Sequence, residues 1–105
     1  MNLSNFIKST VELHSNLILK GEQQKAVSII TKLTLTNDGQ TILLHVANRP
    51  SSHSGLTLGQ LRAQTRLAQP QAKLWLVNPT SGLTSPLFGY YLRKQFLILK
   101  WKISD

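Results

Sequence analysis

The sequence predicts a mainly α-helical single domain that ends in a β-hairpin, an α+β fold. Apolar residues recur at three- and four-residue spacing over residues 5–20, 38–49 and 69–78, as on one face of a helix. Thr57 followed by Gln60 has the pattern of a capping box at a helix start. Residues 87–103 alternate in polarity and are rich in aromatic side chains, which is typical of strands. A chain of 105 residues has room for one modest core, so residues 1–105 are expected to form one domain.

The charge balance indicates an anionic partner. Twelve Lys and Arg stand against four Asp and Glu, and no acidic residue lies between Gly39 and Ser104. Several cations on one surface attract a polyanion and release its counterions on contact. Nucleic acid is the first expected partner and anionic lipid the second; the alternative is a basic protein kept soluble by its net charge.

Other compositional features exclude whole classes of function. The chain has no cysteine, so disulfides, thiol nucleophiles and sulfur-ligated zinc are excluded. No signal peptide is recognisable at the N-terminus and no apolar run has the length of a membrane span. We therefore expect a cytoplasmic protein without a membrane partner.

Residues 1–35 are expected to form an N-terminal helical segment. Ser4 is a suitable N-cap and Gly21 a suitable stop for a helix over about residues 5–20. Leu13 and Leu19 fall outside its apolar stripe. Residues 22–35 are ambiguous, because their apolar spacing is helical while the run "VSIITKLTLT" is rich in β-branched residues.

Residues 34–48 allow two interpretations. Asp38 and Gly39 between apolar runs indicate a hairpin that pairs "TKLTLT" with "TILLHVA". Asn37 followed by Gln40 instead has the form of a capping box, with a helical stripe running to about residue 49. The helix is favoured because of the segments that follow it.

The remaining elements complete the predicted order. A helix over about residues 57–64 leads through a turn at about residues 66–68 to a helix over about residues 69–78, which must end before Pro79. Strands over residues 87–92 and 95–103 meet at Arg93 and Lys94. The predicted core contains Leu43, Val46, Leu61, Ala72, Trp75, Leu76, Phe88 and Leu97.

This order of elements resembles the winged helix-turn-helix superfamily of DNA-binding regulators. In its MarR-type members, a helix that ends at an Arg-Pro corner leads to "LTLGQL", a turn, a recognition helix, a Gly-Leu pair and a two-stranded wing. The corresponding parts here are Arg49 and Pro50, the same six letters from Leu56, residues 69–78, Gly82 and Leu83, and a wing over residues 87–103. The C-terminal "QFLILKWKI" is also similar to the wings of short pilus-operon regulators. The resemblance covers residues 37–103 and implies a sequence-specific transcriptional regulator that binds double-stranded DNA.

The expected DNA contacts follow from this arrangement. Base edges in the major groove are read by donors and acceptors on the recognition helix. Phosphates are contacted by polar and basic residues beside the turn and at the wing tip. The candidate residues are Gln69, Gln71 and Lys73 for bases, Thr57, Gln60, Arg62 and Arg66 for phosphates, and Arg93 and Lys94 at the wing tip.

Two other functions stay open. A winged helix can serve as a protein-protein interaction module in a larger assembly, because a fold alone does not fix function. If residues 34–48 form a hairpin, the chain is a β-rich single-stranded nucleic-acid binder, with strand aromatics that stack unpaired bases. The aromatic residues concerned are Trp75, Phe88, Tyr90, Tyr91 and Trp101.

Catalysis is not expected. His14, His45 and His53 are scattered over different segments, without the paired spacing of metal ligands and with few carboxylates nearby. We expect no enzyme, no metal and no cofactor. Regulators of this size commonly bind two half-sites as dimers. We therefore expect a homodimer formed through about residues 3–19, where Leu13 and Leu19 lie outside the apolar stripe that the core of the domain needs.

Overall fold

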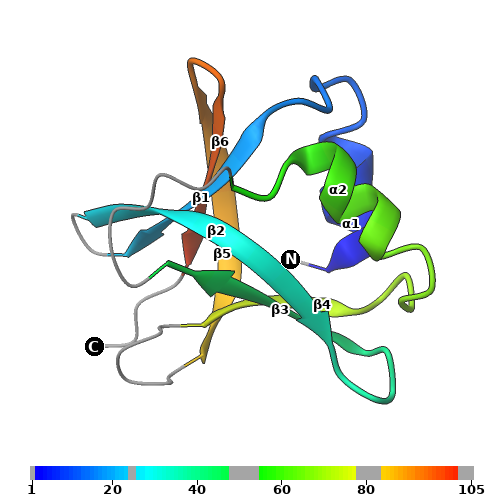
Figure 1. Cartoon of the computed structure of the whole chain (residues 1–105). Helices are drawn as coiled ribbons and strands as arrows, with labels where there is room; N and C mark the ends of the chain where they lie inside the picture. The colour runs from blue at the N-terminus through cyan, green and yellow to red at the C-terminus, as the bar shows by residue number, and fades with distance from the viewer. Residues whose placement is uncertain (1, 24–25, 48–54, 78–83, 102–105) are drawn as a thin grey trace.

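Six β-strands close into a barrel, and two short helices lie together on one side of it, in the computed structural model of the chain (Figure 1). The structure describes residues 2–23, 26–47, 55–77 and 84–101. One helix and three strands follow each other, and this order then repeats: α1 (Leu3–Ser9), β1 (Ile18–Gln23), β2 (Ala26–Leu35), β3 (Thr41–Val46), α2 (Leu58–Gln64), β4 (Lys73–Val77), β5 (Thr84–Arg93) and β6 (Phe96–Trp101). Each strand pairs with the next, and β6 returns to pair in parallel with β1.

The prediction of a mainly α-helical winged helix is wrong. In the described residues the helices span only seven residues each. Residues 38–49 were expected to be helical, but β3 pairs there with β2, with Leu44 opposite Leu33 and Leu43 opposite Thr34. The hairpin interpretation is therefore correct.

The turn between β2 and β3 shows why the capping box did not form. The Asp38 carboxylate accepts hydrogen bonds from the Thr36 hydroxyl at 2.6 Å and from the Gln40 amide at 3.0 Å, and these bonds lower the pKa of Asp38. Gly39 has a φ of 69°, in the left-handed region that glycine adopts without strain. Asp38 thus organises a chain reversal, and the residues after it alternate between the barrel interior and its outside.

The expected recognition helix over residues 69–78 is also wrong, because residues 73–77 form β4. Leu74 and Leu76 point inward and Trp75 points outward, with the period of two that a strand imposes. The helix expected over residues 5–20 ends at Ser9, and Gly21 lies within β1. In that strand a Cβ on Gly21 would lie 3.2 Å from Val46 Cγ2, so the barrel interior leaves little room there for a side chain.

Two predicted elements are confirmed. Thr57 and Gln60 form a complete capping box at the start of α2, with bonds of 3.1 and 2.9 Å. The C-terminal hairpin forms from β5 and β6 around Lys94, whose φ is 56°. It is part of the barrel wall, however, because β5 also pairs with β4 and β6 with β1. The proposed corner at Arg49 and Pro50, the pair Gly82 and Leu83, and residues 78, 102 and 103 lie outside the described residues.

The barrel interior holds most of the predicted core. Among the expected core residues, Val46, Leu61, Ala72, Leu76 and Leu97 are buried. Leu43 and Trp75 are only half-buried on the outside of the barrel, and Phe88 is 64% exposed. These three were assigned inward from helical spacing or strand composition, whereas strand alternation and a bulge turn them outward.

The two halves of the barrel repeat one pattern of strand pairing. Lys20 lies opposite Ile29 between β1 and β2, and Trp75 lies opposite Pro86 between β4 and β5. Ile18 pairs with Phe96 as Lys73 pairs with Thr41. The offset is 55 residues from β1 to β4 and from β3 to β6, and 57 from β2 to β5.

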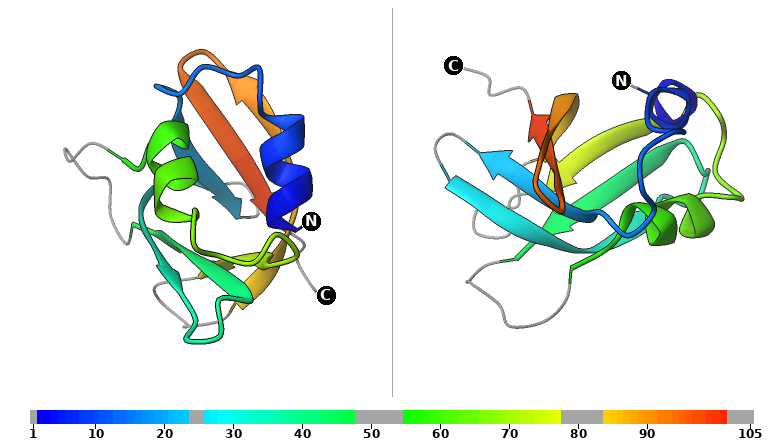
Figure 2. Two further views of the ribbon diagram at one scale, coloured as in Figure 1. Left: turned by 90° about the vertical axis from the view of Figure 1, so that its right-hand side faces the viewer. Right: turned by 90° about the horizontal axis from the view of Figure 1, so that it is seen from above.

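The helices obey the same repeat. The Leu3 amide donates to the Ala72 carbonyl at 2.7 Å, and the Leu58 amide donates to the Leu17 carbonyl at 2.9 Å. Each bond joins the start of one helix to the residue just before the first strand of the other half. A half-turn of the barrel therefore exchanges its halves. The left view of Figure 2 looks at the side that carries both helices and shows α2 at the left and α1 at the right, as such a rotation places them.

This architecture removes the basis of the expected dimer surface. Leu19 is fully buried inside the barrel, and Leu13 packs against the same core. Residues 1–35 are not a separate segment, because β1 and β2 form part of the barrel wall. No helix in the described residues is long and apolar enough to cross a membrane.

Candidate nucleic-acid interface

A small group of side chains covers the outside of β5, β6 and β1. Leu97 and Leu99 of β6 point into the barrel, so Ile98 between them points outward. Ile98 is nevertheless only 3% exposed. Its neighbours in the sheet are Tyr91 on β5 and Lys20 on β1, and their side chains stand on the same outer face.

Cations and aromatic rings alternate on this face. The Lys20 ammonium lies 3.7 Å from the centroid of the Phe96 ring. The Lys100 ammonium lies 5.9 Å from the Phe88 centroid and 5.8 Å from the Tyr91 centroid. These are cation–π distances, so each ammonium is held close to an aromatic surface. We call these five residues, Lys20, Phe88, Tyr91, Phe96 and Lys100, the aromatic-basic face.

A β-bulge brings Phe88 to this face. Leu87 lies opposite Trp101, and the next paired residue is Gly89, opposite Lys100, so Phe88 is an extra residue on β5. A bulge bends the strand and redirects a side chain. The Phe88 ring is therefore largely exposed beside Lys100 and is absent from the core in which it was expected.

Glu22 is the acidic residue of this region. It lies on β1 opposite Lys100, and its side chain forms a hydrogen bond with the Tyr91 hydroxyl. This bond raises the pKa of Tyr91, with further contributions from burial and from the charge of Glu22. The Glu22 Oε2 atom is buried and has no hydrogen-bond partner among the described residues.

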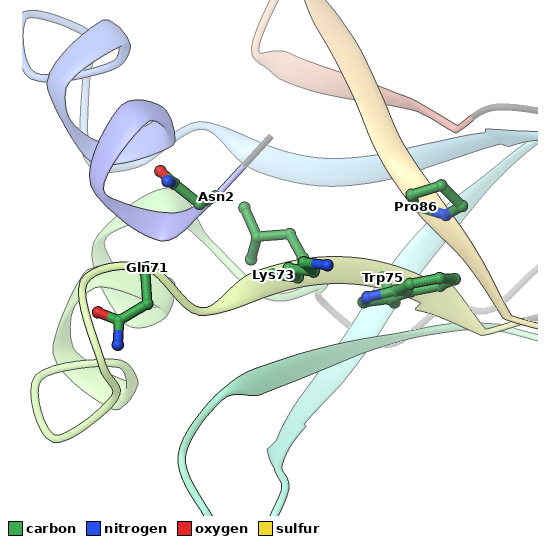
Figure 3. A pocket seen from close by; sticks show the side chains of 6 residues that line it. Asn2, Gln71, Lys73, Trp75 and Pro86 are labelled. Carbon is green, nitrogen blue, oxygen red and sulfur yellow. The ribbon is translucent and has the colours of Figure 1, made fainter.

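A pocket of about 420 Å³ opens beside the aromatic-basic face, at the N-terminal end of β4 (Figure 3). Trp75 and Pro86 lie opposite each other on β4 and β5, and Phe88 follows two residues after Pro86. The pocket is lined by Asn2, Gln71, Lys73, Leu74, Trp75 and Pro86. The chain therefore offers a further aromatic ring and a further cation along the same strand.

Most of the pocket lining comes from the second half of the chain, and Asn2 comes from the first. At the equivalent place in the first half, Gly55 packs so closely against Ile29 and Ile18 that a Cβ on it would overlap Ile29. The counterparts of Ile18 and Ile29 are Lys73 and Pro86, which line the pocket. The two residues that Gly55 contacts in the first half thus have counterparts that line the pocket in the second half.

The residues predicted to contact DNA lie in three separate places. Gln71 and Lys73 line the pocket, and Gln69 is exposed in the segment before it. Arg93 and Lys94 lie at the exposed β5–β6 turn, with Arg93 opposite Phe96. The remaining four, Thr57, Gln60, Arg62 and Arg66, belong to α2 and the turn that follows it.

Three of the four residues at α2 form hydrogen bonds within the protein through their side chains. The side chains of Thr57 and Gln60 satisfy the first turn of their own helix. The Arg62 guanidinium donates to the Thr10 carbonyl and so joins α2 to the end of α1. Arg66 is exposed. These residues are not brought together with Lys73 or Arg93 on one helix face.

Sequence reasoning missed Lys20, Phe96 and Lys100. Lys100 lies between Leu99 and Trp101 in the alternating run "LKWKI", which is a usable signal for an outward strand position. Lys20 follows three apolar residues and precedes Gly21, so the sequence around it gives no such signal. The proximity of Lys20 to Phe96 and Lys100 depends on the parallel pairing of β1 with β6, across almost the whole chain.

Among residues 2–23, 26–47, 55–77 and 84–101, no three His, Cys, Asp or Glu side chains gather as the ligands of a metal ion would. His45 lies on β3 with its Nε2 3.0 Å from the Thr34 hydroxyl. Burial and the charge of Lys32 lower the pKa of His45. His53 lies outside the described residues.

No protein-family model, no curated protein and no solved structure matches the chain. The function of the chain is therefore inferred from the chemistry of the aromatic-basic face.

Proposed function

We propose that this chain binds single-stranded nucleic acid through the aromatic-basic face. The observation that carries the proposal is the alternation of Lys20, Phe96, Lys100, Phe88 and Tyr91 over three neighbouring strands. Proteins that bind single strands combine cations that follow the phosphates with aromatic rings on which bases stack. Both groups are present here at adjacent positions.

A single strand suits this face better than a duplex. The exposed ring of Phe88 offers stacking surface, and bases in a duplex are already stacked on one another. The segment expected to enter the major groove is strand β4, and the cap of α2 uses the side chains of Thr57 and Gln60. The helix that was expected to read duplex DNA is therefore not present.

The charge distribution supports the same proposal. The chain has a formal net charge of +8, which favours polyanion binding. Arg93 and Lys94 extend the positive charge from Phe96 to the β5–β6 turn. Lys73 adds a cation in the other direction, on β4, beside the Trp75 ring. A nucleic-acid strand that crosses β4, β5, β6 and β1 thus meets a cation on β4, β6 and β1.

Fluorescence anisotropy with labelled single-stranded DNA and RNA, duplex DNA, heparin and polyglutamate tests the proposal. Single strands are expected to bind more tightly than the duplex and than either non-nucleic polyanion at equal ionic strength. Phe88→Ala is expected to weaken single-strand binding by about 1–3 kcal/mol, the contribution of one stacked base. Because Phe88 is exposed, its replacement should leave the melting temperature almost unchanged.

Leu67→Ala is the matched control, because Leu67 is an apolar side chain, 92% exposed, away from the aromatic-basic face. It is expected to leave binding unchanged. Equal binding of polyglutamate and single strands would instead indicate an acidic protein partner. Preferential duplex binding that survives Phe88→Ala would refute the proposal.

A further inference from the structure

We infer that the pocket beside Trp75 binds one nucleotide, with its base stacked on the indole ring and its phosphate held by the Lys73 ammonium. The inference rests on the proposed function for the class of ligand, and it adds a site outside the aromatic-basic face. The juxtaposition that carries it is a pocket of about 420 Å³ lined by an aromatic ring, a cation and two carboxamides. Sites for small molecules measure about 300–1,000 Å³ and combine apolar walls with a few polar groups.

The pocket has two chemically different ends. Trp75 and Pro86 lie directly opposite each other on β4 and β5 and form an apolar end. Asn2 and Gln71 lie at the other end, and Lys73 lies between the two ends (Figure 3). A nucleotide has the same division, since its base is a flat ring and its sugar and phosphate are polar. The described lining contains no acidic residue, so no negative charge in it repels a phosphate.

The side chains assigned to the ligand are accessible from outside the barrel. Lys73 is exposed, and Trp75 is half-buried. Leu74 between them points inward, so the two flanking side chains stand on the outer face of β4, roughly 6–7 Å apart along the strand. One nucleotide spans this separation. An ammonium is a common ligand of phosphate, and an aromatic ring is a common stacking surface for a base.

The pocket lies at a gap between two neighbours of β4. One edge of β4 pairs with β3 along its whole length. On the other edge Asn2 forms a bridge with Lys73, and Pro86 pairs with Trp75. Leu74, between these two contacts, lines the pocket. The walls are therefore held by backbone pairing on both sides of the gap.

The other half of the barrel shows that the architecture does not require this chemistry. The counterpart of Lys73 is Ile18, and the counterpart of Trp75 is Lys20. Gly55 covers Ile18, because a Cβ on Gly55 would lie 3.0 Å from Ile18 Cγ2. The repeated fold thus accepts a covered isoleucine where Lys73 is exposed. Ligand binding accounts for a cation followed by an indole on β4, and the fold does not.

Intrinsic tryptophan fluorescence reports on the pocket, because Trp101, the other tryptophan of the chain, is only 7% exposed. Adenosine 5′-monophosphate is expected to quench Trp75. Adenosine, which lacks the phosphate, is expected to bind about threefold to tenfold more weakly. Lys73→Gln is expected to remove this difference. Lys32→Gln is the matched control, an exposed lysine on β2, and is expected to keep it.

A second titration determines whether the nucleotide belongs to a strand or is free. Anisotropy measures the binding of labelled oligothymidylate to the wild-type chain and to Trp75→Leu, after circular dichroism melting has verified that the variant is folded. A nucleotide of a strand predicts that Trp75→Leu weakens this binding by about fivefold or more, the loss of one stacked base, and that oligothymidylate displaces the monophosphate. A free nucleotide predicts unchanged oligothymidylate binding and no displacement. Either result supports a nucleotide in the pocket.

The outcomes separate this inference from the proposed function. Strand binding that depends on Phe88 and on neither Trp75 nor Lys73, without quenching by the monophosphate, would refute the pocket site alone. Quenching that Lys73→Gln leaves unchanged, or that a neutral disaccharide produces equally well, would also refute it. Loss of all strand binding with Lys73-dependent quenching retained would refute the proposed function alone.

Discussion

Thr10 and Thr65 occupy equivalent places in the two halves of the barrel and make the same hydrogen bond. The Thr10 hydroxyl donates to the Phe6 carbonyl at 2.7 Å, and the Thr65 hydroxyl donates to the Leu61 carbonyl at 2.8 Å. Both side chains are buried at the C-terminal end of their helices. The repeat thus extends to a polar contact inside the protein.

Replacing either threonine by valine is expected to lower the free energy of unfolding by about 1 kcal/mol, the typical contribution of one such hydrogen bond. Valine keeps the side-chain shape and removes only the hydroxyl. Urea unfolding of Thr10→Val, Thr65→Val and the double variant measures this effect. Equivalent sites in separate halves predict similar, additive losses; a loss confined to one variant would contradict the equivalence.

Gly55→Ala is expected to destabilise the barrel by about 1–3 kcal/mol, because the added methyl group would overlap Ile29 and press on Ile18. Gly89→Ala is the matched control, since a Cβ there meets no atom within 4 Å. Thermal unfolding compares the two variants. A Gly55→Ala variant as stable as Gly89→Ala would show that the segment before α2 does not pack against β1 and β2 as described.

Stability is expected to fall as the pH drops below about 6.5. Burial and the charge of Lys32 lower the pKa of His45 in the folded chain, so the unfolded chain binds this proton at a higher pH than the folded chain does. The contribution of His45 is complete above the unfolded pKa of 6.5 and declines below it, toward the lower folded pKa. Melting temperatures measured from about pH 8 to about pH 5, the range over which histidine titrates, test this expectation. His45→Gln should flatten the curve, and an unchanged slope in this variant would assign the dependence to other groups.

Salt dependence distinguishes cations that contact phosphates from other surface cations. Lys100→Gln is expected to reduce the slope of log affinity against log salt by about 0.7 for a single strand. Lys32→Gln removes the same charge from β2, outside the aromatic-basic face, and is expected to leave the slope unchanged. Equal changes in both variants would mean that binding follows net charge and not this face.

Local signals predicted some elements well. The capping box at Thr57 and Gln60 determines α2 through bonds within four residues, so the sequence was sufficient to find it. The β5–β6 hairpin was also predicted, because its alternation extends over two long runs. The prediction for residues 73–77 was wrong because a five-residue strand is too short for its period of two to be distinguished from helical spacing.

The repeat itself left little trace in the sequence. Leu3 and Thr10 recur as Leu58 and Thr65, but most other equivalent positions differ, as Lys20 and Trp75 do. Strand pairing and burial constrain polarity more than identity. A comparison of the chain with itself at an offset of 55 would have been needed to detect it.

The candidate site was only partly predictable for a related reason. Gln71 and Lys73 were singled out and do lie together, at a pocket beside Trp75 and not on a helix. The contact between Lys20 and Phe96 could not be predicted, because it requires the first and last strands to pair. Long-range pairing cannot be read from a local pattern.

The closure of the barrel by β1 and β6 determines how a partner can be recognised. In the part of the chain that the structure describes, every strand already has a neighbour on each side over part of its length, so only short edge segments are left to which a foreign strand could be added. Recruitment through main-chain hydrogen bonds, the usual route of strand addition, is therefore restricted for partners of this wall. Selectivity must come from side chains that project from it, and a few substitutions on the outside can redirect the protein to another ligand while the interior stays the same.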